Sequence, residues 1–172
     1  MGDAPEVGAT KGMCALVSQE GKRYEVSRET AMQSMLVKEM VDEEEGEDSV
    51  LDIPLPNVKS SVLEKVIEFC SHHVKEPMPD IEKPLKSANM NEVVSEWDAN
   101  FVDLDQEALF ELILAANYMD IKSLLDLTCA KVASMIKGKS PEEIRETFNI
   151  TNDFTPEEEA RVREENKWCE RS

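Results

Sequence analysis

The pattern Ser/Thr-Pro-Glu-Glu occurs twice in the last third of the chain, at residues 140–143 and 155–158. Each copy predicts the start of a helix. The hydroxyl can cap the first turn, the proline has no N–H to leave unpaired, and the second glutamate can reach back to the cap. Helices this short are marginal in water unless packing holds them, so we expect another surface to cover their apolar residues. These residues are few but large: Ile144, Phe148, Ile150, Phe154 and Trp168.

The first half of the chain predicts a small sheet with helices beside it. Residues 13–17 and 24–26 flank a turn-like segment, which is typical of a β-hairpin. One helix is expected over 27–40, with Ser27 as its cap. Residues 50–56, VLDIPLP, alternate in polarity but contain two prolines that cannot donate to a ladder, which indicates a short edge strand. A helix then follows from Asn57, and its apolar face is expected to comprise Val62, Leu63, Val66, Ile67 and Cys70.

The second half predicts an irregular connector and then a series of helices. Residues 74–96 hold three of the eight prolines and show little periodicity. Two helices with a tight corner at 118–123 are expected next, and Gly138 would cap the second of them. We therefore divide the chain into a disordered segment 1–12, a domain 13–137 and terminal helices 138–172. The periodic positions of the two helices are Leu109, Leu112, Ile113 and Ala116, followed by Leu124, Leu125, Cys129, Val132 and Ile136.

The first of these two helices carries more apolar residues than one buried face needs. Leu114 adds to Leu109, Leu112 and Ile113, and Tyr118 lies where the helix ends. The pattern alone allows two interpretations. Either the helix is buried on two sides within its own domain, or it presents one side to a partner.

Charge and cysteine usage restrict the partners. The formal charge of −18 and the isoelectric point near 4.5 would repel phosphate, so neither nucleic acid nor an anionic membrane is an expected partner. The chain also lacks an apolar run of the roughly 18 residues that a membrane span needs, and its start does not resemble a signal peptide. The four cysteines show no C-x-x-C spacing, which favours reduced thiols in the cytoplasm or nucleus. We expect the partners to be proteins.

The sequence offers little for catalysis. His72 and His73 are adjacent on a predicted helix, so they point to different sides and cannot hold one metal ion together. Cys70 and His73 have the spacing of a nucleophile and a base, but Cys70 belongs to the apolar face and no orienting group is suggested. The chain contains no glycine-rich phosphate loop and no G-x-S-x-G motif. We expect a protein without catalytic activity that requires no metal, nucleotide or other cofactor.

Four stretches of the chain resemble the Skp adaptor family of SCF (Skp–cullin–F-box) ubiquitin ligases. They are IPLPNV at 53–58, LFELILAANYMDIKSLLDLTC at 109–129, MIKGKSPEEIRETFNI at 135–150 and NDFTPEEEARVREENKW at 152–168. The resemblance implies an α+β chain with a BTB/POZ fold, in which helices ring a small sheet, and a helical C-terminal extension. It also implies that an F-box, a small helical motif, covers the capped helices.

The resemblance further implies two sets of contact residues. The F-box-binding residues would be Leu125, Val132, Ile136, Phe148, Ile150 and Trp168, and the cullin-binding residues would be Pro54, Leu55, Pro56, Asn117 and Tyr118. Such a protein would join F-box substrate receptors to a cullin scaffold, and through the cullin to a RING subunit, for protein ubiquitination and proteasomal degradation. The alternative is a self-associating BTB/POZ protein-interaction module. Such a module has no need of the paired capped helices that end in Trp168.

Overall fold

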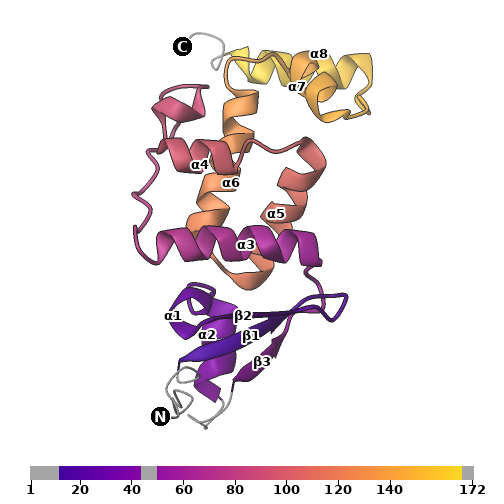
Figure 1. Cartoon of the computed structure of the whole chain (residues 1–172). Coiled ribbons are helices and arrows are strands. Elements are labelled where there is room, and N and C mark those ends of the chain that lie inside the picture. Colours follow the sequence, from indigo (N-terminus) through magenta and orange to yellow (C-terminus); the bar gives the residue numbers. More distant parts are fainter. Residues whose placement is uncertain (1–11, 44–49, 168–172) are drawn as a thin grey trace, which may run out of the picture. The chain divides into compact units, whose positions relative to one another are not determined.

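The computed structural model describes residues 12–43 and 50–167, and the chain divides into two compact units between Lys137 and Gly138 (Figure 1). Except for Gly12, the predicted disordered segment 1–12 lies outside the described residues. The first unit contains β1 (Met13–Val17), β2 (Arg23–Ser27), α1 (Arg28–Ala31), α2 (Met35–Glu43), β3 (Leu51–Pro54), α3 (Ser60–His73), the 3-10 helix η1 (Met90–Glu92), α4 (Glu96–Phe101), α5 (Gln106–Met119) and α6 (Lys122–Ile136). The second unit contains α7 (Pro141–Phe148) and α8 (Pro156–Glu165).

The sheet has three strands in the order β2-β1-β3. β1 pairs with β2 in antiparallel register, which confirms the predicted hairpin, and it pairs with β3 in parallel. Leu16 of β1 lies opposite Tyr24 on one side and Ile53 on the other. β3 is an edge strand, as its two neighbouring prolines predicted. Cys14, Ala15 and Leu16 are all buried, so the central strand is covered on both of its faces.

The single helix predicted over 27–40 is wrong, because the structure has two helices there. Ser27 does cap α1, since its hydroxyl accepts the Thr30 N–H at 3.1 Å. The chain then turns, and the Ser34 hydroxyl accepts the Val37 N–H at 3.2 Å and donates to the Met119 carbonyl. A serine that bonds the backbone in this way competes with helix continuation, so α2 begins afresh after it. Ala31 of α1 is buried, whereas Met35 at the start of α2 is 44% exposed.

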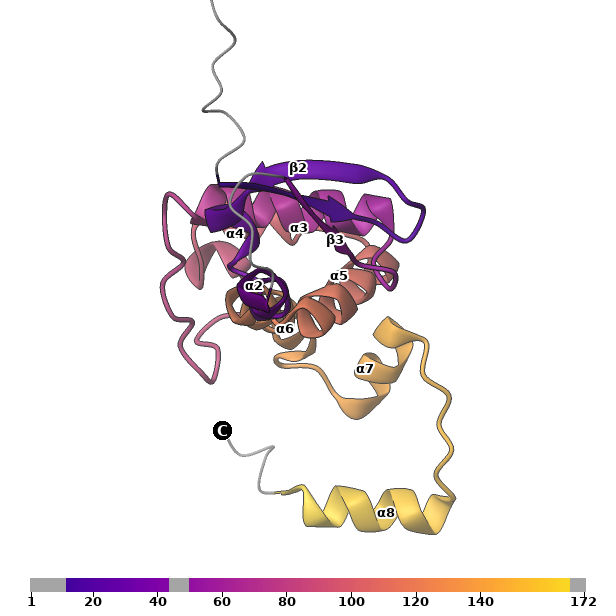
Figure 2. The ribbon, with the colours of Figure 1, turned by 90° about the horizontal axis from the view of Figure 1, so that it is seen from below.

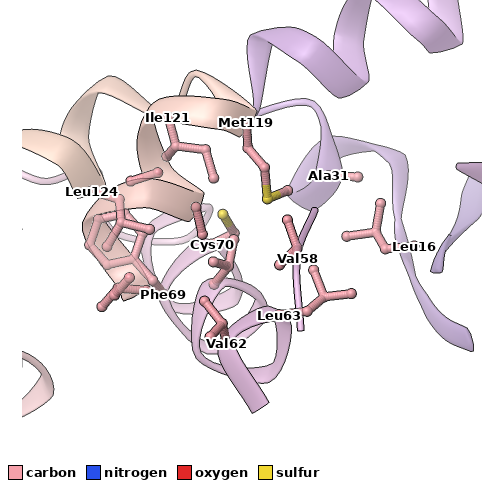
Figure 3. Packing of buried hydrophobic residues seen from close by; sticks show 14 of the residues in the cluster. Leu16, Ala31, Val58, Val62, Leu63, Phe69, Cys70, Met119, Ile121 and Leu124 are labelled. Carbon is pink, nitrogen blue, oxygen red and sulfur yellow. The ribbon is translucent and has the colours of Figure 1, made fainter. Parts of the chain in front are cut away.

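The core of the first unit lies between α3 and the helices that pack against it, α1 and α5 (Figure 3). The buried residues of α3 include Val62, Leu63, Val66 and Cys70, as predicted, whereas Ile67 is half-buried. Phe69, which the periodicity did not single out, is fully buried. Figure 2 shows the sheet and α3 on one side of this unit and α5 and α6 on the other. This arrangement places one face of α5 and one face of α6 at the surface of the unit.

α5 and α6 are each followed by a residue with a positive φ angle. α5 ends at Asp120, which has a left-handed conformation with φ of 53°, and the chain turns directly into α6. Short polar side chains are among the few that tolerate this conformation. Gly138 follows the last residues of α6 with φ of +76°, where the absence of a Cβ removes the strain. The tight corner predicted between α5 and α6 is confirmed. The C-cap of α6 is Lys137, whose N–H donates to the Ala133 carbonyl at 3.0 Å, so Gly138 lies one residue beyond the predicted cap position.

The buried side chain of His73 makes polar contacts near both ends of the connector. His73, at the end of α3, has Nδ1 2.7 Å from the Glu76 carbonyl oxygen and Nε2 2.6 Å from Asp98 Oδ1 on α4. The other oxygen of Asp98 accepts a hydrogen bond from the Ser95 hydroxyl at 2.9 Å. Apart from η1, the connector is irregular, as predicted. Because it is held at Glu76 and again at Ser95, its path between those residues is restrained.

The helices of the second unit start where the sequence predicted. The Ser140 N–H donates to Glu143 Oε2 at 2.7 Å, and the Glu143 N–H donates to the Ser140 hydroxyl at 3.3 Å. Thr155 and Glu158 repeat this reciprocal pair at 2.9 and 3.2 Å. Each helix also has proline in its first turn. At the start of each helix, two backbone N–H groups that have no partner within the helix are hydrogen-bonded, which stabilises the first turn.

The second unit has no hydrophobic core of its own among its described residues. Neither α7 nor α8 contains a buried residue, and Ile150 and Phe154 are 54% and 48% exposed. Contacts between the two helices include a 3.6 Å ion pair from Arg145 to Glu159 and a second from Arg163 to Glu142. The Arg163–Glu142 pair is exposed, and an exposed ion pair contributes at most about 1 kcal/mol, whereas the Arg145–Glu159 pair is half-buried. Ile144 and Phe148 are half-buried, and that another surface covers the apolar residues of these helices stays a prediction.

Candidate functional site

One face of α5 carries large apolar side chains at the surface. Phe110, Leu114 and Tyr118 recur every four residues and are 39%, 69% and 36% exposed. The buried residues Leu112 and Met119 lie on another face. Within the first unit one side of this helix is core and the other is open, so the helix is not buried on two sides there; that its open side meets a partner stays a prediction. An exposed apolar row of this kind is typical of an interaction surface.

A groove of about 430 Å³ lies beside this row, between α5 and the chain that leads from β3 into α3. An ion pair joins the two sides of the groove: Lys59 Nζ, just before α3, lies 2.6 Å from Glu111 Oε1 on α5. This hydrogen bond to Glu111 raises the pKa of the Lys59 ammonium group. An apolar floor with a polar, charged rim is the usual composition of a protein interface. We call this feature the α5 groove; its lining residues are Asn57, Val58, Lys59, Val62, Glu111, Leu114, Ala115 and Tyr118.

The residues that the resemblance assigned to cullin binding do not all reach the surface. Pro54, Pro56, Asn117 and Tyr118 are exposed. Leu55 is fully buried, and its N–H donates to the Val17 carbonyl at 2.8 Å. The side chain of Leu55 therefore belongs to the core of the first unit, and a contact of Leu55 with a partner stays a prediction.

The sequence reasoning missed several residues of the α5 groove. Leu114 had a signal, because the apolar residues of α5 exceeded one face. Lys59 and Glu111 had none, since they are 52 positions apart and only the fold brings them together. Asn57 joins the groove because the segment after β3 turns back along the end of α5, which a local pattern does not reveal.

A second apolar face lies on α6. Leu125 and Val132 are half-buried and Ile136 is 37% exposed, whereas Leu124 and Leu127 point into the core. Of the remaining residues assigned to F-box binding, Phe148 is half-buried and Ile150 is exposed in the second unit, and Trp168 lies outside the described residues. That these residues act together with the α6 face stays a prediction.

The Cys70–His73 pair is not arranged as a nucleophile and a base. Cys70 is 4% exposed, and burial raises the pKa of its thiol to about 12. Figure 3 shows Cys70 among apolar core side chains, including Met119 and Ile121. Both ring nitrogens of His73 are engaged by Glu76 and Asp98. Cys70 thus stays a neutral thiol at physiological pH, in keeping with the structural role that the sequence favoured.

This burial predicts selective alkylation of the native protein. Cys14 and Cys70 are buried, burial raises the pKa of both thiols, and Cys129 is exposed. We expect iodoacetamide at neutral pH to label Cys129 and to spare Cys14 and Cys70, because only an accessible thiolate reacts readily. Peptide mapping of the native and the denatured, reduced protein measures this difference. Rapid labelling of Cys70 in the native protein would contradict the described core.

Two searches of the structure give negative results. Residues 12–43 and 50–167 contain no group of three or more histidine, cysteine or acidic side chains placed to hold a metal ion. Within the same residues, no helix is long and apolar enough to cross a membrane.

Comparison with known proteins gives matches along most of the chain. Residues 12–75 match the Skp1 family tetramerisation domain, a POZ domain, and residues 122–169 match the Skp1 family dimerisation domain. The S-phase kinase-associated protein 1 homolog of Tetrahymena thermophila is 56% identical over 164 residues, which cover 95% of this chain and 96% of that protein. The E3 ubiquitin ligase complex SCF subunit sconC of Arthroderma benhamiae is 53% identical over 155 residues, covering 90% and 93%. The same subunit of Talaromyces stipitatus is 53% identical over 159 residues, covering 92% and 98%.

Proposed function

The chain belongs to the Skp1 family, and from this premise we propose that it is the adaptor subunit of an SCF ubiquitin ligase. The α+β architecture with a BTB/POZ domain, expected from the resemblance, is confirmed by the match over residues 12–75. The observation that carries the proposal is the extent of the likeness to proteins named as SCF subunits, which covers at least nine-tenths of both chains. The adaptor joins F-box proteins on one surface to a cullin scaffold on another, and through the cullin to a RING subunit.

The α5 groove is the proposed cullin side. Tyr118 lies at its rim with 36% of its surface exposed, and Leu114 gives it an apolar wall. Tyrosine suits such a position, because it buries a large area at low entropic cost and keeps a polar tip for the rim. The exposed Pro54, Pro56 and Asn117 extend the same proposed contact.

The α6 face and the capped helices are the proposed F-box side. Val132 and Ile136 offer an incomplete apolar surface on α6, and Phe148 and Ile150 are not fully buried within the second unit. A helical partner that packs on these residues would provide the core that the second unit lacks. This requirement supports an F-box as partner over self-association of the BTB/POZ domain, which would leave α7 and α8 without a role.

The proposed adaptor acts by binding alone. Membership of this family, in which a relative is named as a subunit of a ligase complex, is in keeping with a non-catalytic role. The burial of Cys70 and the occupied nitrogens of His73 support that role for the described part of the chain. We further propose that the protein acts in the cytoplasm and nucleus, which suits the free cysteines Cys14, Cys70 and Cys129.

Affinity isolation of the tagged full-length chain from cells, followed by mass spectrometry of the bound proteins, tests the proposal. We expect F-box proteins and a cullin with its RING subunit to be recovered together. Recovery of the chain only with copies of itself would favour the self-associating module instead.

The segment 140–172 should become ordered when a partner binds. Its described helices contain no buried residue, so little opposes their transient opening in the free protein. We expect slow amide exchange in this segment only in the complex with an F-box fragment. Hydrogen exchange read by mass spectrometry, with α5 as the internal reference, measures the change. Equal protection of residues 140–167 in the free and bound protein would contradict the proposed grip on the F-box.

A further inference from the structure

A second groove, of about 440 Å³, lies between the connector and α6 within the first unit. Ile81, Pro84 and Leu85 form its connector wall, and Cys129, Ala133 and Ile136 form its helix wall. Its volume falls within the range of roughly 300–1,000 Å³ that ligand sites occupy. None of the connector residues was assigned a function from the sequence. We call this feature the connector groove.

The rim of the connector groove carries two lysines and one carboxylate. Lys83 and Lys137 are exposed at its edge, and Asp126 Oδ1 lies 3.3 Å from Lys83 Nζ. Asp126 therefore offsets the charge of Lys83, and the rim keeps a net charge of one lysine, which in a chain with a formal charge of −18 makes a local site for a carboxylate. The occupant that fits is therefore a peptide segment with an apolar side chain and a neighbouring acidic residue.

The connector wall is held in place before any partner arrives. His73 fixes one end through the Glu76 carbonyl and the other through Asp98, whose carboxylate also accepts from Ser95. Ile81 and Leu85 pack against the core of the unit. A wall that is already ordered does not have to lose conformational freedom on binding, which favours affinity.

The groove is continuous with the face proposed for the F-box. Ile136 lines the connector groove and also belongs to the α6 face with Val132. We propose that the connector groove is an additional contact site for F-box proteins, which binds an apolar side chain and an adjacent carboxylate from the segment next to the part seated on α6. This inference rests on the proposed adaptor function and adds the connector to the receptor-binding surface.

Charge reversal at the rim tests the inference. Lys83→Glu in the full-length protein should weaken binding of a purified F-box protein fragment, containing the F-box and its flanking residues, on the order of tenfold. Lys86→Glu is the matched control, because Lys86 is an exposed lysine of the same connector that does not line the groove. It should bind as the unsubstituted protein does. Calorimetric titration at low and high salt measures the affinity of each variant for the fragment. The difference in affinity between the two variants should shrink at high salt, because salt screens the charge contact.

A second variant tests the apolar part. Leu85→Ala shortens the connector wall and should also weaken F-box binding, while cullin binding stays unchanged. Thermal unfolding of each variant shows whether the fold is intact.

If Lys83→Glu and Lys86→Glu bind the fragment equally, the connector groove is not a contact site, although the adaptor function stands. If the unsubstituted protein does not bind the fragment, the adaptor function itself fails. If the substitutions instead change amide protection of residues 138–167 or the mass of the free protein, the occupant is the chain's own terminal unit or a second copy, and the inference is wrong.

Discussion

Tyr118→Lys is expected to weaken cullin binding by at least about 2 kcal/mol, roughly 30-fold, and to leave F-box binding unchanged. Tyr118 lines the α5 groove at the end of α5 and is 36% exposed, so its ring is available to a partner. A lysine there would carry its charge into a contact from which the partner excludes water, and Glu111, the carboxylate that lines the groove, is already paired with Lys59. Calorimetric titration with a cullin N-terminal fragment measures the loss.

Tyr118→Phe is the matched control for this change. It keeps the ring and removes only the hydroxyl, so most of the affinity for the cullin should remain. Thermal unfolding must accompany both variants, because the next residue, Met119, is buried and its carbonyl accepts the Ser34 hydroxyl. Undiminished cullin binding by a folded Tyr118→Lys protein would show that the α5 groove is not the cullin site.

Trp168→Ala is expected to weaken F-box binding by roughly 2 to 4 kcal/mol, about 30- to 1,000-fold, without affecting the cullin. Trp168 lies outside the described residues, so this prediction rests on the motif NDFTPEEEARVREENKW. The structure supports it indirectly, since Ile150 and Phe154 of the same unit are about half exposed and a partner is needed to cover them. A large aromatic side chain is the usual anchor of such a contact.

Trp168→Phe should retain much of the F-box affinity, because it keeps an aromatic ring at the same position. Titration of both variants with one F-box fragment separates the loss of the ring from a general change in the tail. A Trp168→Ala protein that binds the fragment as tightly as the unsubstituted chain would remove Trp168 from the proposed surface.

The elements that the sequence predicted well depend on neighbours in the chain. The capping boxes at Ser140 and Thr155 each require a glutamate three positions on, and both pairs form as expected. The β1–β2 hairpin and the corner at Asp120 are similarly local. The elements that were missed depend on distant contacts. The break between α1 and α2 combines a local bond, from the Val37 N–H to the Ser34 hydroxyl, with a contact from Ser34 to the Met119 carbonyl 85 positions away, which the local pattern does not show.

In the candidate site, too, features set by neighbouring residues could be predicted and features set by distant contacts could not. The surplus of apolar residues on α5 left two interpretations open, and the structure shows that the side with Leu114 is exposed within the first unit. The walls opposite α5 and α6 come from other parts of the chain. Lys59 reaches the α5 groove from the start of α3, and Ile81 and Leu85 reach the connector groove from an irregular segment with no periodicity to interpret. Leu55 was assigned by the resemblance, and its burial depends on packing that the local sequence does not show.

The proposed adaptor must bind its two partners through separable surfaces. The most direct measurement is the set of four affinities obtained by titrating Tyr118→Lys and Trp168→Ala each against a cullin N-terminal fragment and an F-box fragment. The proposed function predicts that Tyr118→Lys loses the cullin and keeps the F-box, and that Trp168→Ala loses the F-box and keeps the cullin. If either folded variant lost both partners to the same extent, a bridge with two independent surfaces would be contradicted.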